Sequence, residues 1–304
     1  MSLSPPRALP AEFIAPDLPE LVKPRRKRGR LARFIIRHPT IFAGLVLIGL
    51  MLLIALLAPF LGTTDPTALA PARRLRPPSA QYWFGTDMLG RDVYSRVIYG
   101  TRVSLIVGFA VAFLAAVTGL AIGLVAGFVR WSDAIIMRVM DGLMSIPPIL
   151  LAIALIALTR GSVQNVVIAI TISEIPRVAR LIRSVVLGLR ELPFIEAAIA
   201  CGTRTPKLIL RHVLPNTLAP LAVQATYICA SAMITEAILS FIGAGTPPTI
   251  PSWGNIMAEG RALWQIKPSI VFFPAIFLSA TVLGVNLLGD GLRDALDPRR
   301  ALRP

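Results

Sequence analysis

Residue types that commonly carry out catalysis are scarce in this 304-residue chain. It has two histidines, His38 and His212, and two cysteines, Cys201 and Cys229. Neither histidine lies in a cluster of Cys, Asp or Glu, and the cysteines form no Cys-x-x-Cys motif. This spacing supplies neither a set of metal ligands nor a nucleophile with a base beside it. We therefore expect no catalytic residue, no metal site and no disulfide framework, and structural or interfacial roles for both histidines.

The phosphate-binding pattern Gly-x-x-x-x-Gly-Lys-Ser/Thr is absent from the sequence. In nucleotide-binding proteins that loop cradles the phosphates with its backbone N–H groups. We expect no cofactor in this chain, and any use of ATP would require a separate chain.

Three acidic residues, Asp141, Glu174 and Glu236, lie within or beside long apolar stretches. A charge at the centre of a bilayer costs about 2.5 to 3.5 kcal/mol or more, so such side chains usually face a cavity or a partner. Each also has a structural alternative. Asp141 could cap the helix after it, Glu174 could pair with Arg177 one turn later, and Glu236 could order the loop at residues 247–254. The sequence leaves both the pathway and the structural roles open.

The composition is that of an integral membrane protein. Hydrophobic residues make up 55% of the chain and charged residues 15%, which excludes an ordinary soluble enzyme. The net charge of +15 could indicate nucleic-acid binding, but the charges lie between apolar runs rather than on a soluble scaffold. Because loops on the cytoplasmic side of membrane proteins are rich in Lys and Arg, topology explains the charge more simply.

We predict an all-α protein with six membrane-spanning helices. Their ranges are residues 41–61, 103–129, 142–158, 163–176, 216–241 and 270–289. The second carries Gly119, Gly123 and Gly127 at four-residue spacing, which predicts a face that another helix can approach closely. The third contains Pro147 and Pro148, which predict a bent or unwound start. The first span has 21 residues, enough to cross about 30 Å and longer than the apolar part of a signal peptide.

The spans divide the chain into segments. Residues 1–38 form a basic, partly disordered tail, 39–61 the first helix, 62–102 an extracytoplasmic loop with a short amphipathic helix, 103–298 the core, and 299–304 a C-terminal tail. If the N-terminus is cytoplasmic, the inner segments hold 22 of the 31 Lys and Arg residues. The run Lys23–Arg30 contributes to this bias, although it could also be a nuclear signal or a lipid site. The count predicts that both termini are cytoplasmic.

The polar segment, residues 190–216, interrupts the apolar pattern on the cytoplasmic side. Glu196, Ala197 and Ala198 favour a helix, and Gly202 permits a left-handed corner. Thr205 followed by Pro206 predicts an N-cap and a second short helix, which Pro215 would end. Two short exposed helices with a sharp corner are typical of a docking element.

The polar segment resembles the EAA loop of ABC-importer permeases, with Glu196-Ala197-Ala198, then Gly202, then Leu214-Pro215 in order. In that family the loop is a coupling helix that inserts into a cytoplasmic ATPase. The resemblance implies coupling roles for Ile195, Glu196, Ala197, Ala198, Ile199, Gly202, Thr205, Leu214 and Pro215. It further implies a type I importer fold in a bacterial cytoplasmic membrane. The partners would be a second permease, two subunits that bind ATP and Mg²⁺, and an extracytoplasmic solute-binding protein.

Three further blocks resemble the oligopeptide, dipeptide and nickel permease subfamily. They are residues 84–105, which contain Gly-Thr-Asp-Met-Leu-Gly-Arg-Asp, residues 236–254 and residues 286–298. His212, Cys201 and Tyr82 depart from the usual pattern without changing the family. The resemblance implies short peptides as cargo, with nickel, glutathione or another small solute as alternatives. A membrane enzyme or an ungated channel remains a different class of function.

Overall fold

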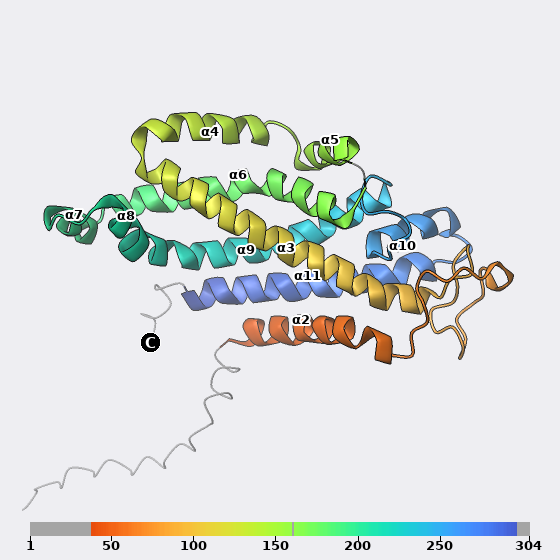
Figure 1. Ribbon diagram of the computed structural model, residues 1–304. Coiled ribbons are helices and arrows are strands. Elements are labelled where there is room, and N and C mark those ends of the chain that lie inside the picture. The colour runs from red at the N-terminus through yellow and green to blue at the C-terminus, as the bar shows by residue number, and fades with distance from the viewer. Residues whose placement is uncertain (1–37, 160, 297–304) are drawn as a thin grey trace, which may run out of the picture. The chain divides into compact units, whose positions relative to one another are not determined.

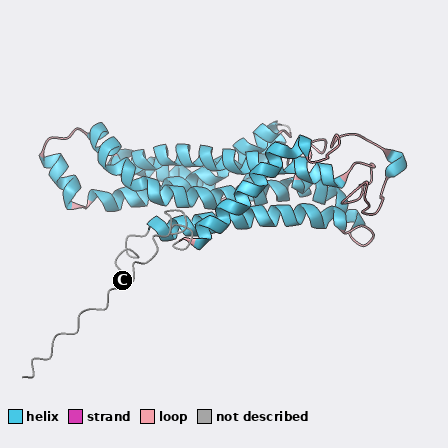
Figure 2. Ribbon diagram, turned by 90° about the horizontal axis from the view of Figure 1, so that it is seen from below, coloured by secondary structure: helices cyan, strands magenta, loops and turns pink. Residues whose placement is uncertain are grey.

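The computed structural model describes residues 38–159 and 161–296. Within these residues the chain is helical, with no strand beyond an isolated bridge between Thr86 and Asp92 (Figures 1 and 2). The predictions for the basic tail, for Lys23–Arg30 and for residues 297–304 lie outside the described residues. The helices are α2 (Pro39–Leu57), α3 (Val93–Phe128), α4 (Arg130–Met144), α5 (Pro148–Thr159), α6 (Val163–Arg190), α7 (Pro193–Ala200), α8 (Thr205–Leu208), α9 (Leu214–Phe241), α10 (Trp253–Gly260) and α11 (Ser269–Leu296).

Among the described residues, four helical stretches are long and apolar enough to cross a membrane: Pro39–Phe60, Val93–Phe128, Thr205–Phe241 and Ser269–Leu296. A fifth crossing results if the bent pair α4 and α5 forms one span. The predicted fourth span lies in α6, which continues past Pro176 to Arg190 and carries several charged residues. Its assignment as a sixth span stays a prediction.

Small residues bring the long helices together. A Cβ atom on Gly123 would lie 2.7 Å from the carbonyl oxygen of Ala179, and one on Gly127 would lie 2.7 Å from Cβ of Val186. The predicted glycine face of α3 therefore packs directly against α6. Gly44 of α2 lies equally close to the backbone of α11. Such close approach lets van der Waals contacts hold helices together where the surrounding lipid is itself apolar.

The helix pair α4 and α5 is sharply bent. The chain turns by 88° between Met144 and Pro148, as the two prolines predicted. Because Pro148 has no N–H to donate, it can begin α5 but cannot continue α4. The segment 130–141, predicted as an inner loop, is instead part of helix α4.

The long helices carry different structures at their two ends (Figure 1). At one end lie α7 and α8, and at the other lie α10 and the segment that joins α2 to α3. We call them the α7 end and the α10 end. The predicted amphipathic helix of the 62–102 loop is the first part of α3, whose N-cap Asp92 accepts a hydrogen bond from the N–H of Ser95 (3.0 Å).

Candidate functional site

Helix α7 is the centre of the polar segment. Leu192 precedes it in an extended conformation, and Pro193 occupies the first turn, where a missing N–H does no harm. Three buried aliphatic side chains, Ile195 of α7, Leu208 of α8 and Val213 beyond it, belong to the same apolar core. These side chains fix the short helices onto the long ones.

The exposed face of α7 differs from the predicted one. Ile195 was expected on a docking face, but it is fully buried in the chain's own core. Glu196 and Ala197 are exposed, Ala198 is half-buried, and Ile199 is exposed. Phe194, which the sequence analysis did not single out, adds a large exposed apolar ring. A helix of eight residues thus presents apolar groups and one carboxylate to the solvent.

Gly202 makes the predicted corner. Its φ is +76°, in the region that L-residues with a side chain rarely adopt. The N–H of Gly202 donates to the carbonyl of Ile199 (2.9 Å), and that of Thr203 to the carbonyl of Ala198 (3.1 Å). This pair of bonds is the Schellman motif, which satisfies the last carbonyls of a helix and reverses the chain. A Cβ on Gly202 would meet nothing within 4 Å, so the requirement for glycine comes from the backbone alone.

Two details of the second short helix were predicted wrongly. The N-cap of α8 is Arg204 rather than Thr205, which is the first helical residue. Pro215 does not end a helix, because it lies in the first turn of α9 and the chain passes from α8 through a π-helical stretch, Ile209–Val213, into α9. Helix α8 is therefore continuous with α9, which is part of a stretch long and apolar enough to cross a membrane.

The charges of the polar segment are available for a partner. Glu196, Arg204, Lys207 and Arg211 are exposed. None of the four forms an ion pair with another of the described residues. Cys201 is also exposed.

The three candidate intramembrane acids all have protein partners. Asp141, expected as a possible cap, instead accepts a hydrogen bond from Arg180 of α6 (2.6 Å). Glu174 is nearly buried and lies 3.3 Å from Arg177, the local pair that was one of its two alternatives.

Glu236 is fully buried near the α10 end of α9. Its Oε1 accepts hydrogen bonds from Ser240 (2.8 Å) and Thr246 (3.4 Å). Asn255 donates to the carbonyls of Thr246, Pro247 and Ile250. Glu236 thus belongs to a network that orders the loop after α9, the structural role the sequence left open.

The sequence did not predict a cluster of four charges at the α10 end, of which Asp87, Arg91 and Arg96 are buried and Glu259 is partly exposed. Arg96 donates to Asp87 (2.8 Å) and to Glu259 (3.1 Å), and Arg91 donates to the same two carboxylates (2.7 and 2.5 Å). The side chains of Asp87 and Arg96 are each 1% exposed. The block at residues 84–105 contained three of these residues, but nothing local pointed to Glu259 as their partner.

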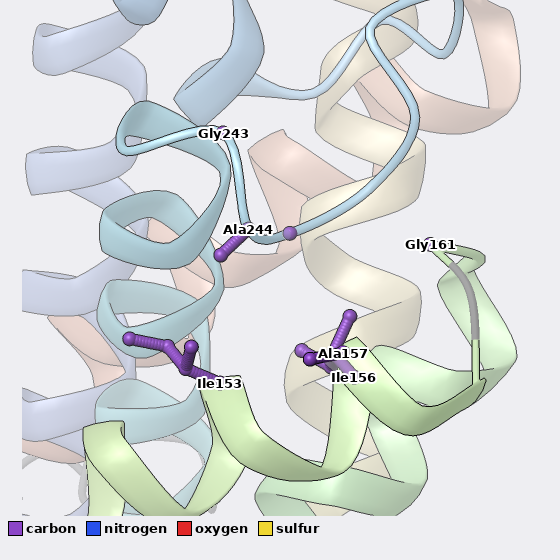
Figure 3. A pocket seen from close by; sticks show the side chains of 7 residues that line it. Ile153, Ile156, Ala157, Gly161, Gly243 and Ala244 are labelled. Carbon is purple, nitrogen blue, oxygen red and sulfur yellow. The ribbon is translucent and has the colours of Figure 1, made fainter.

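An apolar cavity of about 300 Å³ lies between α5 and the loop that follows α9 (Figure 3). Ile153, Ile156 and Ala157 form one wall, and Gly243 and Ala244 form the other. No charged side chain among the described residues lines it.

The comparisons with known proteins decide the family. Residues 119–302 match the family "Binding-protein-dependent transport system inner membrane component". The chain belongs to this family. Residues 29–78 of this permease also match the N-terminal TM domain of oligopeptide transport permease C. It is therefore a multi-pass inner membrane transport protein rather than a soluble enzyme.

The permease has curated relatives along nearly its whole length. It is 53% identical over 92% of its chain to a probable peptide ABC transporter permease protein, y4tQ, of Sinorhizobium fredii (96% of the relative covered). It is 45% identical over 84% of its chain to the dipeptide transport system permease protein DppC of Alkalihalophilus pseudofirmus (84% covered). Glutathione transport system permease protein GsiD of Escherichia coli is 42% identical over 88% of each chain.

A solved structure shows the same fold. An inward-facing MetNI methionine ABC transporter matches 66% of the permease and 96% of its own chain, with a TM-score of 0.56 and 22% identity. The likeness supports an importer-permease fold and carries no information about cargo.

Proposed function

We propose that this permease is the transmembrane channel subunit of an ATP-driven importer that carries short peptides. The single observation that carries the proposal is the polar segment, in which α7 presents an exposed face and the Gly202 corner joins it to α8, which continues through a π-helical stretch into α9. An ungated channel or a membrane enzyme has no need for such an element. The names of the peptide and dipeptide permease relatives support the cargo.

In this proposal, separate cytoplasmic subunits bind and hydrolyse ATP with Mg²⁺, and this chain binds no cofactor. Their closure would move α7 through contacts with Phe194, Glu196 and Ile199, while Gly202 keeps the corner tight. Because the two states differ in these contacts, ATP can shift the equilibrium between inward-facing and outward-facing forms. A second permease subunit would complete the channel, and an extracytoplasmic solute-binding protein would deliver the cargo.

The proposed orientation places the α7 end in the cytoplasm. The excess of Lys and Arg in the inner segments supports it. The α10 end, with its ordered loop, would then face the binding protein outside the membrane.

Transport in reconstituted vesicles tests the proposal. The permease is reconstituted with the second permease and ATPase subunits encoded beside it, and with their binding protein, and uptake of a labelled dipeptide is measured with and without ATP. Uptake that requires both ATP and this chain is the expected result. Uptake of glutathione in place of dipeptides would assign the alternative cargo, because a GsiD relative is 42% identical. ATP-independent flux of either solute would contradict the importer.

A further inference from the structure

Helix α6 carries three arginines at three-residue spacing, Arg177, Arg180 and Arg183, which places them along one side of the helix. Two of them are matched by carboxylates of α4. Arg183 donates two hydrogen bonds to Asp133 (2.5 and 2.6 Å), and Arg180 donates one to Asp141 (2.6 Å). Arg177, the farthest of the three from the α7 end, has no such partner on α4, whose sequence contains no third acidic residue.

The bend between α4 and α5 explains why Arg177 is left over. Helix α4 ends at Met144, and the chain turns by 88° into α5, which contains no charged residue. The turn leaves a cavity of about 230 Å³ beside Arg177. The end of α4, the break and the start of α5 contribute only apolar side chains to its walls, and α6 contributes Ser173 and Arg177.

The cavity lies beside the end of the predicted fourth span, residues 163–176. Val178, the neighbour of Arg177, packs against Gly119, which lies within the charge-free stretch at residues 103–129. A charged side chain at the edge of a membrane span usually faces water, a cavity or a partner. The side chain of Arg177 is nevertheless 50% exposed in this chain.

Glu174 is only a partial partner for the guanidinium of Arg177. Its Oε2 lies 3.3 Å from Nη1 of Arg177, longer than the roughly 2.7 to 2.9 Å of a strong charge-assisted hydrogen bond. The carboxylate is nearly buried, while the guanidinium has five N–H donors and extends to the cavity. The pair lowers the cost of holding Arg177 beside apolar walls and leaves donors free to bind an anion.

We propose that Arg177 is a solute-binding residue whose guanidinium binds the carboxylate of the transported solute in the cavity at the α4–α5 break. This inference rests on the proposed function. A guanidinium and a carboxylate match in a two-bond geometry, and the apolar walls suit the carbon atoms beside that carboxylate. Because typical ligand pockets measure roughly 300 to 1,000 Å³, a cavity of about 230 Å³ holds one end of a peptide. The permease would therefore recognise the C-terminal carboxylate of the transported peptide.

Two peptides that differ at one group test this assignment. The assembled transporter is reconstituted with wild-type permease or Arg177→Gln, and ATP-driven uptake of a dipeptide is compared with uptake of its C-terminal amide. Since the same binding protein serves both variants, its own preference cancels when each peptide's uptake is expressed relative to wild type. Arg177→Gln is expected to lower uptake of the free acid about tenfold or more, as for loss of a charged hydrogen bond, and uptake of the amide less than twofold. Arg177→Lys should retain part of the difference.

Arg180→Gln is the matched control. It removes the same charge about one turn along α6, at a residue that is already paired with Asp141. It should not distinguish the two peptides. Equal losses of both peptides in Arg177→Gln would overturn the inference and assign Arg177 to a structural contact, such as an ion pair with the second permease. Unchanged uptake of the free acid would overturn it as well.

Labelling gives a second readout that does not depend on delivery of the amide. In a Cys201→Ser, Leu151→Cys permease, the free-acid dipeptide should slow thiol labelling of the cavity residue, and Arg177→Gln should abolish that protection. No protection by the free acid would contradict the inference. Uptake by the wild-type transporter distinguishes failure of the proposed function from failure of the Arg177 inference. ATP-dependent uptake by wild type supports the importer function whatever the Arg177 variants show. Absence of that uptake would contradict the importer function itself.

Discussion

The α10 end and the α7 end of the permease differ in whether their charged side chains pair with one another or are exposed. At the α10 end, buried Asp87, Arg91 and Arg96 form ion pairs with one another and with the partly exposed Glu259. Trp253 donates a hydrogen bond to the carbonyl of Val97 (3.1 Å). At the α7 end, Glu196, Arg204, Lys207 and Arg211 are exposed and form no ion pair among the described residues. One end binds its polar groups to itself, and the other presents them outward.

This difference indicates which end is built to be fixed and which to be engaged. Removing one partner of a buried ion pair leaves an uncompensated charge, so a buried network resists rearrangement. Exposed charges cost little to expose and can form new contacts when a partner arrives. The α7 end is anchored by a few buried aliphatic side chains and is free to follow a partner.

The largest expected effect is at the α10 end. Arg96→Met removes a buried cation from two carboxylates and should lower the free energy of unfolding by about 3 to 5 kcal/mol. Denaturant unfolding of the full chain in detergent measures it. Arg204→Met at the α7 end, an exposed arginine, should stay within about 0.5 kcal/mol of wild type. Equal losses of unfolding free energy in the two variants would contradict the difference between the α10 end and the α7 end.

The helices that connect the two ends come next. Gly123→Ala places a methyl group against the backbone of Ala179 and should cost about 1 to 3 kcal/mol through overpacking. Gly188→Ala, on a helical surface with nothing within 4 Å, should instead stabilise by about 0.5 to 1 kcal/mol. The same unfolding assay compares them. A tolerated Gly123→Ala would show that α3 and α6 are not packed as described.

Two glycines with positive φ separate coupling from stability. Gly202 (φ +76°) lies at the α7 end and Gly243 (φ +85°) at the α10 end, and a Cβ on either would meet nothing within 4 Å. Changing either to Asp should cost about 1 kcal/mol of backbone strain. Only Gly202→Asp should raise the number of ATP molecules hydrolysed per peptide imported, with membrane insertion intact. A normal ratio in Gly202→Asp would count against the role of the polar segment.

The smallest effect concerns orientation. Replacing Arg25, Arg26, Lys27 and Arg28 removes four of the 22 inner positive charges and should only weaken the N-terminus-inside topology. Accessibility of a tag at residue 2 to an impermeant reagent measures it. If the wild-type permease has its N-terminus outside, the α7 end would lie outside and the α10 end in the cytoplasm, opposite to the proposed orientation.

Local chemistry explains what could be predicted from the sequence. The bend at Pro147-Pro148, the close face at Gly119, Gly123 and Gly127, and the corner at Gly202 each depend on properties of a few adjacent or regularly spaced residues. Helix boundaries followed the apolar pattern well in α9 and at the start of α11, which continues past the predicted end at residue 289 to Leu296.

Contacts between residues far apart in the sequence could not be predicted, because local chemistry does not indicate them. Glu259 meets Arg96 across 163 residues, and no local signal connects them. Ile195 lies on the buried side of α7 because α6 and α8 pack against this helix, which an eight-residue apolar pattern cannot reveal. The sequence predicts a helix end at Pro215, but the structure places this proline in the first turn of α9, where it is tolerated.

Cross-linking between α7 and a cytoplasmic ATPase tests the central claim most directly. A cysteine at exposed Ala197, in a Cys201→Ser background, is reacted in assembled membranes with and without ATP. Ala68→Cys, exposed in the segment between α2 and α3, is the control. We predict a cross-link from residue 197 whose yield changes with ATP, and none from residue 68. With the ATPase present and assembled, absence of any cross-link from residue 197 would contradict the account.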